Sequence, residues 1–197
     1  MKKTIVILKL LFIMGCILLI SGCMSQKEST NSNIQVGEWN DLDFVNHWSN
    51  IAFTLPLDYT VRHLEELDSI PGQTDDFFLS HIDKTASIAL MYIDLLHDRI
   101  DQTPEEYLNI TISQLAGSAN KTYMFNAEFK SVLIADEEYI VASSEFIFKD
   151  RPRETGNHQD GYVRKFDDAL IVFLTVYSDN KKDSVESFLF SIETPER

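Results

Sequence analysis

Apolar residues from about position 39 onward recur mostly with the spacing of β-strands. Residues 87–93 and 170–174 are apolar on both alternating faces, which predicts central strands covered from both sides. Residues 51–55 alternate between apolar and polar positions and stop at Pro56, whose nitrogen cannot donate to a sheet. The pattern therefore predicts a β-sheet whose middle is buried on both faces.

Short polar turns join most of these strands into hairpins. The predicted hairpins pair residues 77–82 with 86–95 around Asp83-Lys84-Thr85, residues 123–134 with 139–148 around 135–138, and residues 161–166 with 169–177 around Asp167-Asp168. Residues 61–67 are interpreted as a short helical or irregular stretch, and residues 149–160 as a polar loop. Hairpins of this kind build an antiparallel sheet.

One helix is predicted from a capping signal at Thr103. Thr103 suits the N-cap, Pro104 suits the first helical position, and Glu106 completes a capping box. Apolar residues at helical spacing follow, namely Tyr107, Leu108, Ile112 and Leu115. The helix is expected to end near Gly117.

A second helix is predicted close to the end of the chain, over residues 180–192. Its apolar residues lie at positions i, i+3, i+4 and i+7, which forms one stripe of the helix surface: Val185, Phe188, Leu189 and Ile192. Such a stripe is typical of core packing. Hairpins combined with separate helices indicate the α+β class, an antiparallel sheet flanked by helices.

The N-terminus has the order of an export signal. Met1-Lys2-Lys3 carries positive charge, as the start of a signal peptide does. The uninterrupted apolar run of residues 10–20 is shorter than the roughly 20 residues that span a bilayer. A permanent membrane anchor is the alternative. Leu19-Ile20-Ser21-Gly22-Cys23 resembles the lipobox of bacterial lipoproteins. The resemblance implies that the Cys23 sulfur receives diacylglycerol and that the chain is then cleaved between Gly22 and Cys23, with palmitate among the acyl chains. Buried acyl chains would then hold the protein on the outer side of the cell membrane.

Three parts follow along the chain. Residues 1–22 are expected to be the signal peptide, residues 23–37 a polar flexible tether, and residues 38–197 one α+β domain. Trp39 is the first residue expected to pack in the domain.

The net charge and the cysteine content argue against several classes of function. The first 22 residues hold three lysines and no acid, so their removal changes the net charge from −14 to −17. Such a surface argues against nucleic-acid binding. After cleavage Cys23 is the remaining cysteine, which leaves no disulfide, no cysteine nucleophile and no cysteine-based zinc site.

The order of features also resembles the PsbP-like family. Trp48 and Phe53 precede Leu55-Pro56 and Tyr59, and a hairpin then leads into a Thr-Pro-Glu-Glu-Tyr-Leu helix. Two long strands and a further hairpin lead into a Ser-Val-Glu-Ser-Phe-Leu helix. The likeness covers residues 39–193 and implies a PsbP-like α/β/α sandwich. It transfers no catalytic motif, because this fold serves unrelated functions.

The sequence carries no strong catalytic motif. It has no His-Glu-x-x-His, Gly-x-Ser-x-Gly or phosphate-binding glycine loop, and its five histidines are interpreted as surface or turn residues. Paired acids occur at Asp75-Asp76, Asp98 with Asp101, Asp136-Glu137-Glu138 and Asp167-Asp168. Three of these four groups lie at predicted turns, where aspartate bonds to its own backbone, so turn chemistry is favoured over a metal site. No cofactor is predicted.

These observations favour a non-enzymatic binding or accessory module of unknown ligand, anchored to the membrane and open to an envelope protein partner. The segment Lys149-Asp150-Arg151-Pro152-Arg153-Glu154 concentrates positive charge in an acidic chain. Lys149, Arg151 and Arg153 are therefore candidates for a partner-docking loop. The alternative is a carboxylate-dependent hydrolase acting on cell-wall or extracellular glycans, which requires a cleft holding two acids. A purely structural role in an envelope complex is a third hypothesis.

Overall fold

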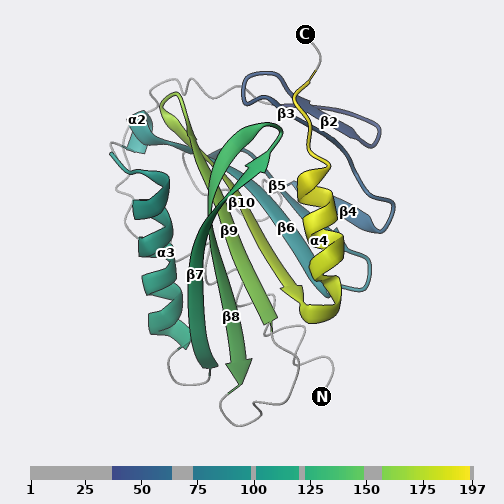
Figure 1. The fold of residues 1–197 in the computed structure, drawn as a ribbon. Helices are drawn as coiled ribbons and strands as arrows, with labels where there is room; N and C mark the ends of the chain where they lie inside the picture. The colour runs from purple at the N-terminus through teal and green to yellow at the C-terminus, as the bar shows by residue number, and fades with distance from the viewer. Residues whose placement is uncertain (1–36, 64–72, 99–100, 120–122, 149–156, 196–197) are drawn as a thin grey trace.

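The computed structural model describes residues 37–63, 73–98, 101–119, 123–148 and 157–195, and within them the strands form two antiparallel sheets (Figure 1). The small sheet has the order β1 (Glu38–Asn40), β2 (Asp43–Asn46), β3 (Ile51–Thr54). The large sheet has the order β4 (Tyr59–His63), β5 (Gln73–His81), β6 (Ala86–Asp94), β10 (Ala169–Ser178), β9 (Asn157–Phe166), β8 (Glu137–Phe148), β7 (Tyr123–Ile134). The helical segments are α2 (Leu95–Asp98), α3 (Pro104–Ala119), the 3₁₀ turn η2 (Asp179–Lys181) and α4 (Lys182–Phe190).

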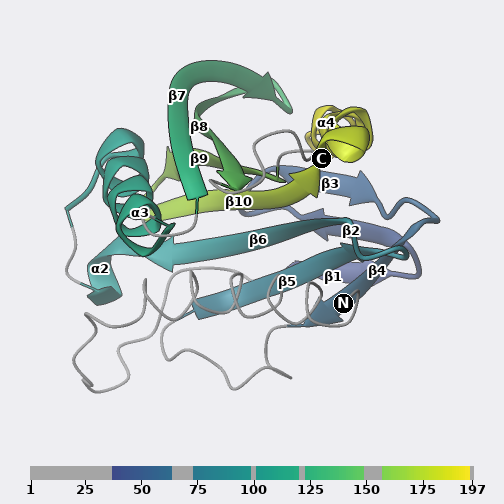
Figure 2. The ribbon, with the colours of Figure 1, turned by 90° about the horizontal axis from the view of Figure 1, so that it is seen from below.

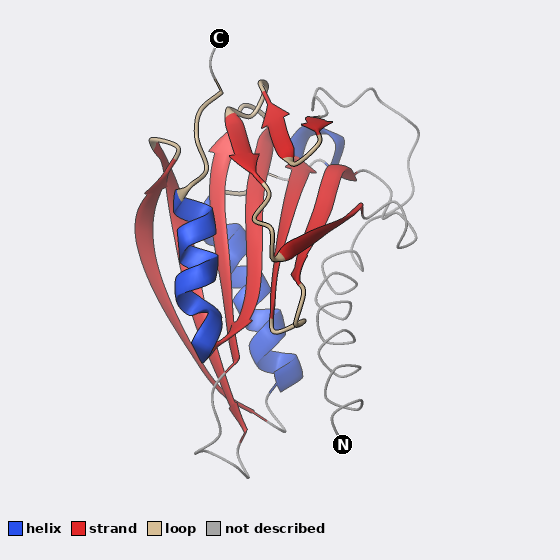
Figure 3. Cartoon of the chain, turned by 90° about the vertical axis from the view of Figure 1, so that its right-hand side faces the viewer, coloured by secondary structure: helices blue, strands red, loops and turns tan. Residues whose placement is uncertain are grey.

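The middle of the large sheet is formed by β6 and β10, the two strands that are apolar on both faces. They pair in continuous register from Ala169 opposite Asp94 to Tyr177 opposite Ala86. Every residue of β6 is buried. Helices α3 and α4 lie on opposite sides of the sheet, α4 in front of the strands and α3 behind them in Figure 3. The predicted α+β fold with a doubly covered central pair is confirmed.

Helix α3 covers one face of the sheet and is held there by apolar side chains. Its predicted capping box is present, since Thr103 N donates to Glu106 Oε2 at 2.9 Å and Glu106 N donates to Thr103 Oγ1 at 3.2 Å. Leu108 and Leu115 are buried, and Leu108 lies so close to Gly161 that a Cβ there would stand 2.9 Å from its methyl group. We call this side of the sheet the α3 face.

Helix α4 and the small sheet cover the opposite side, which we call the α4 face. The predicted stripe of α4 is buried there: Val185, Phe188, Leu189 and Ile192. After the helix, Glu193 exchanges two backbone hydrogen bonds of 2.8 Å with Ala52 of β3. In Figure 2 the large sheet curls, and β7 arches away from the plane of β5 and β6.

Several predicted boundaries are wrong for reasons that pairing explains. Residues 61–63 belong to β4, because they pair with β5, and β9 begins at Asn157, within the predicted polar loop. Strand β8 begins at Glu137 rather than Tyr139, after a two-residue turn. Helix α3 does not end near Gly117 but continues to Ala119.

Strand β3 of the small sheet is predicted by the alternation of residues 51–55, whereas β1 and β2 are missing from the sequence prediction. These two strands are three and four residues long, too short for a periodic pattern to be recognised. Asp41 and Asn50 adopt left-handed backbone conformations with φ of 57° and 56°, which close the turns of the small sheet. Among the helices of the described residues, none combines the length and the apolar character needed to cross a membrane.

Candidate functional site

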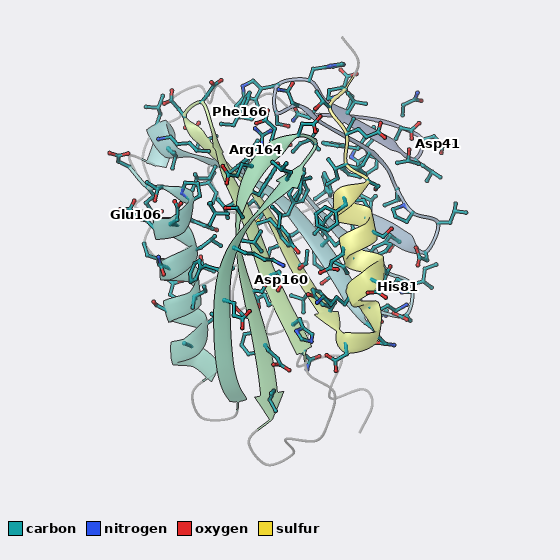
Figure 4. All side chains as sticks on the ribbon, viewed as in Figure 1. Asp41, His81, Glu106, Asp160, Arg164 and Phe166 are labelled. Atoms are coloured by element: carbon teal, nitrogen blue, oxygen red, sulfur yellow. The ribbon has the colours of Figure 1, made fainter. Side chains whose placement is uncertain are left out.

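Strand β9 presents a row of ionisable side chains to the α4 face. The strand pairs on both sides, with β8 and β10, so its alternate residues point to opposite faces of the sheet. The even-numbered residues face α4 and the small sheet: His158, Asp160, Tyr162, Arg164 and Phe166. Figure 4 shows Asp160 and Arg164 at two levels of this strand. This row is the main concentration of buried charge in the described residues.

Asp160 is buried, and its carboxyl group accepts hydrogen bonds from two tyrosines. The residue is 3% exposed. Its Oδ2 accepts hydrogen bonds from Tyr177 Oη at 2.7 Å and from Tyr162 Oη at 3.4 Å. Thr175 Oγ1 donates to the Asp160 main-chain carbonyl at 3.3 Å, so β10 holds both the side chain and the backbone.

The two tyrosines act as hydrogen-bond donors over the whole neutral range. Burial raises the pKa of Tyr162 and of Tyr177, and the adjacent Asp160 carboxylate raises both further. Both phenols are therefore protonated when Asp160 is ionised, which is the arrangement that satisfies a buried carboxylate. His158 stacks on the Tyr177 ring at 5.2 Å between centroids, and its Nε2 lies 2.5 Å from Asp179 Oδ1.

Arg164 is a buried cation that connects three parts of the chain. Its Nε donates to Tyr139 Oη at 2.9 Å, and Nη2 donates to the main-chain carbonyl of Ser49. Nη1 lies 3.8 Å from Glu137 Oε2, and the guanidinium stands 5.0 Å from the centre of the Phe166 ring. The side chain thus ties β9 to β8 and to the turn that joins β2 and β3.

The same turn, residues 47–50, is fixed to the large sheet by neutral groups. Ser49 Oγ lies 3.0 Å from Tyr92 Oη, and Asn46 Nδ2 donates to the same oxygen at 3.3 Å. Asn46 Oδ1 also accepts from Ser49 N at 3.0 Å. Trp48 packs edge-on against Tyr92 and Phe166. These polar and aromatic contacts together hold the small sheet against the α4 face of the large sheet.

A second cluster surrounds His81, at the end of the sheet where α4 begins (Figure 4). His81 Nε2 lies 2.8 Å from Asp58 Oδ2, and Nδ1 lies 2.8 Å from Asp83 Oδ1. Lys181 Nζ lies 2.9 Å from His81 Nε2 and 3.1 Å from Asp83 Oδ2. His81 is 7% exposed, so it is not a surface residue, and its main-chain carbonyl accepts from Lys84 N at 2.8 Å, which makes it the first residue of the β5–β6 turn.

Asp83 is held in its ionised form by the turn that contains it. Burial opposes ionisation, but hydrogen bonds from Thr85 Oγ1, Thr85 N and Lys181, with the His81 charge, lower the pKa of Asp83. Thr85 N donates to Asp83 Oδ1 at 2.9 Å. The cluster therefore connects the β5–β6 turn to the start of α4.

Cys23, Lys149, Arg151 and Arg153 lie outside the residues that the structure describes. Their predicted roles stay predictions.

Asp136 and the pair Asp167-Asp168 lie in hairpin turns as predicted, whereas Glu137 and Glu138 belong to β8. Asp136 and Asp167 have φ of 61° and 50°, which is turn geometry. Among the described residues, no three histidine, cysteine, aspartate or glutamate side chains converge as metal ligands would.

Sequence reasoning missed Asp160 and Arg164. The sequence pattern places Asp160 in the polar loop 149–160 and does not distinguish Arg164 from the rest of its strand. The period-two alternation from His158 to Phe166 is the signal that could have placed both on one face of a strand.

Comparison with known proteins bears on the fold of this chain. No protein-family model matches the chain, and no curated protein gives a significant match. The cyanobacterial PsbP protein (CyanoP) of Synechocystis is similar with a TM-score of 0.54 and 11% identity, over 88% of this chain and 100% of that protein.

Two other solved structures have TM-scores below 0.5. A protein of Bacteroides thetaiotaomicron has a TM-score of 0.43 and 11% identity over 79% of this chain and 48% of its own. The Ran-binding protein Mog1p of Saccharomyces cerevisiae has a TM-score of 0.42 and 13% identity over 74% of this chain and 80% of its own. The similarity to cyanobacterial PsbP shows that this chain has a PsbP-like fold.

Proposed function

We propose that this protein is a lipid-anchored, non-enzymatic accessory module that works on the outer side of a bacterial cell membrane. The anchoring part of the proposal rests on the lipobox-like sequence that ends in Cys23. The non-enzymatic part rests on the buried charges of the α4 face.

The non-enzymatic proposal rests on one observation, namely that the charged groups of Asp160 and Arg164 bind other groups of the same chain. Both are buried, and their charged atoms bind tyrosines, a main-chain carbonyl and a neighbouring carboxylate of the same chain. A catalytic acid or base must reach the proton of a bound substrate. Because Asp160 and Arg164 bind groups of the same chain, we infer that they hold neighbouring parts of the fold in position rather than act on a substrate.

The hydrolase alternative is less well supported by the same residues. Glycoside hydrolysis by the common mechanisms uses two carboxyl groups on either side of the substrate bond. Asp160 is 3% exposed, and its Oδ2 accepts from two tyrosines, so it does not meet a polysaccharide from outside. A glycan-hydrolysing activity that Asp160→Asn abolishes without loss of folding would overturn the non-enzymatic proposal.

Partner docking is proposed for the basic segment that contains Lys149, Arg151 and Arg153. This segment connects β8 to β9, the strand pair that carries Glu137 and Arg164, and it is basic in a strongly acidic chain. An anionic surface of an envelope protein is the partner it suits.

Capture from membranes tests the accessory function. The lipidated full chain is expected to recover a reproducible envelope protein, and replacing Lys149, Arg151 and Arg153 by glutamine is expected to reduce that recovery severalfold. Lys165→Gln, at an exposed position of β9, is the matched control and should leave recovery unchanged. Recovery of no reproducible protein would contradict the proposal.

Lipid attachment has its own test. Cells fed a radiolabelled or alkyne-tagged fatty acid should label the wild-type chain, and Cys23→Ser should abolish the label. A label that is still present in the Cys23→Ser variant would contradict the anchoring proposal and would leave the non-enzymatic proposal unaffected.

A further inference from the structure

Strand β7 forms one edge of the large sheet. It pairs with β8 through twelve consecutive residue pairs, from Tyr123 opposite Phe148 to Ile134 opposite Glu137, without a shift in register. Within the described residues no strand pairs with its outer side. A long edge without proline or bulge is a template for another strand, and natural proteins usually protect such edges.

Both faces of β7 carry exposed side chains. On the side of α3, Phe129 is 47% exposed and Leu133 is 64% exposed. On the opposite side, the exposed residues Glu128 and Lys130 carry opposite charges on either side of Phe129. The strand therefore offers apolar area on one face and a balanced charge pair on the other.

The hairpin turn decides which backbone groups face outward. Ala135 and Asp136 form a two-residue turn with φ of 52° and 61°, and such a turn is closed by a residue pair that exchanges both hydrogen bonds, here Ile134 and Glu137. Hydrogen-bonded pairs alternate along the ladder, so the N–H and C=O of Leu133, Ser131 and Phe129 point away from β8.

We propose that β7 pairs with β7 of a second copy of this chain, antiparallel and centred on Phe129. The outward N–H of each Phe129 then donates a hydrogen bond to the outward C=O of the other Phe129. Each Glu128 lies opposite a Lys130 of the other copy, at a non-hydrogen-bonded pair where side chains are closest. Two such charge pairs form per dimer, and the large sheets join into one. The inference does not depend on the proposed accessory function.

Charge complementarity selects this register from its neighbours. Shifting the centre to Ser131 keeps the outward backbone groups in phase but places Glu128 opposite Ile134 and Lys130 opposite Val132. Shifting it to Ala127 places Glu128 opposite Asn126. Of the three, the Phe129-centred register alone pairs opposite charges, and cross-strand opposite charges stabilise a sheet whereas like charges destabilise it.

Cysteine cross-linking in the full chain tests the pairing. The background carries Cys16→Ser and Cys23→Ser, so the introduced cysteine is the sole one. Phe129→Cys places two sulfurs across a pair whose Cα atoms lie about 5.5 Å apart, within disulfide range. Ser131→Cys, on the same face of the same strand, places them more than about 13 Å apart.

The purified full chain in detergent is oxidised and separated on a non-reducing gel. We expect at least about fivefold more covalent dimer for Phe129→Cys than for Ser131→Cys, because the latter pair lies beyond disulfide reach. Equal yields, no dimer from either variant, or a higher yield from Ser131→Cys would overturn the proposal. In a parallel experiment on whole cells, a cross-link between the Phe129→Cys variant and a different protein would overturn the choice of a second copy as occupant.

Charge exchange tests the register without cysteines in the interface. Glu128→Lys and Lys130→Glu should each lower the dimer fraction in sedimentation velocity severalfold, because like charges then face each other. The double variant Glu128→Lys/Lys130→Glu should restore it, as should an equal mixture of the two single variants. Asp101→Lys, at an exposed position before α3, is the control for net charge. Failure of both restorations, with circular dichroism unchanged, would overturn the proposal.

Discussion

Val163 and Arg164 are adjacent in β9, and they show how differently the two faces of the large sheet are covered. Val163 is fully buried among apolar side chains on the α3 face. Arg164, 4% exposed, lies on the α4 face and binds Tyr139, Ser49 and Glu137. Apolar contact positions α3, whereas directional polar contacts add to apolar packing beneath the small sheet.

The difference between the two faces explains why charged side chains are buried on the α4 face. Apolar burial stabilises without regard to direction, so a regular helix with a clear stripe needs little else. The turn at residues 47–50 belongs to a sheet of very short strands and has few apolar residues of its own. Hydrogen bonds with Arg164 and Tyr92 specify its position, at the cost of burying polar groups.

The largest expected effect comes from removing the cation of the α4 face. Arg164→Ala leaves the Tyr139 hydroxyl and the Ser49 carbonyl without their donor. A buried polar group left without its partner costs about 1–3 kcal/mol, so we expect a loss of about 2–6 kcal/mol in the free energy of unfolding. Urea denaturation measures it. Val163→Ala, on the opposite face, removes apolar area only and should cost about 2 kcal/mol. An Arg164→Ala loss no larger than that of Val163→Ala would contradict the comparison.

High pH should weaken the α4 face through its tyrosines. The pKa values of Tyr162 and Tyr177 are raised above their ordinary value of 10.0 on folding. Both therefore ionise first in the unfolded chain, so stability is intact below pH 10 and falls as the pH rises above it, by about 1.4 kcal/mol per pH unit for each tyrosine.

The double variant Tyr162→Phe/Tyr177→Phe isolates this effect. It lowers stability at neutral pH, because Asp160 loses both donors, but it should flatten the fall between pH 10 and 11. The slopes of unfolding free energy against pH are compared by urea denaturation. Equal slopes for variant and wild type would show that other groups cause the alkaline loss.

The α3 face offers a smaller effect at its capping box. Thr103→Ala removes the acceptor of Glu106 N, and we expect a loss of about 1 kcal/mol. Thr103→Ser retains the hydroxyl and is the control. Thermal denaturation followed by circular dichroism distinguishes them, and equal losses in both variants would argue against the cap.

The smallest effect is expected at the rim of the α4 face. The folded pKa of Asp83 is lowered, so its contribution is present above its unfolded value of 3.8 and is lost as the pH falls. Its side chain is 45% exposed, so solvent limits the contribution to about 0.5 kcal/mol. Asp83→Asn should flatten the acid limb of the stability curve, whereas Asp101→Asn should not.

Local patterns were sufficient for the elements whose signals are contained in a few neighbouring residues. The capping box at Thr103, the stripe of α4 and the doubly apolar strands β6 and β10 are each explained by propensity and periodicity. The same holds for the turns at Asp136 and Asp167, where a short polar side chain tolerates a left-handed backbone.

The sequence by itself therefore determined the α+β class, both long helices and the order of the hairpins. Only the tertiary structure decided that Asp160 and Arg164 lie on one buried face, that His81 lies between two aspartates, and that residues 38–54 form a separate small sheet. The physical reason is that burial and pairing depend on residues far away in the chain. Arg164 meets Ser49 across 115 positions, a distance over which no local pattern acts.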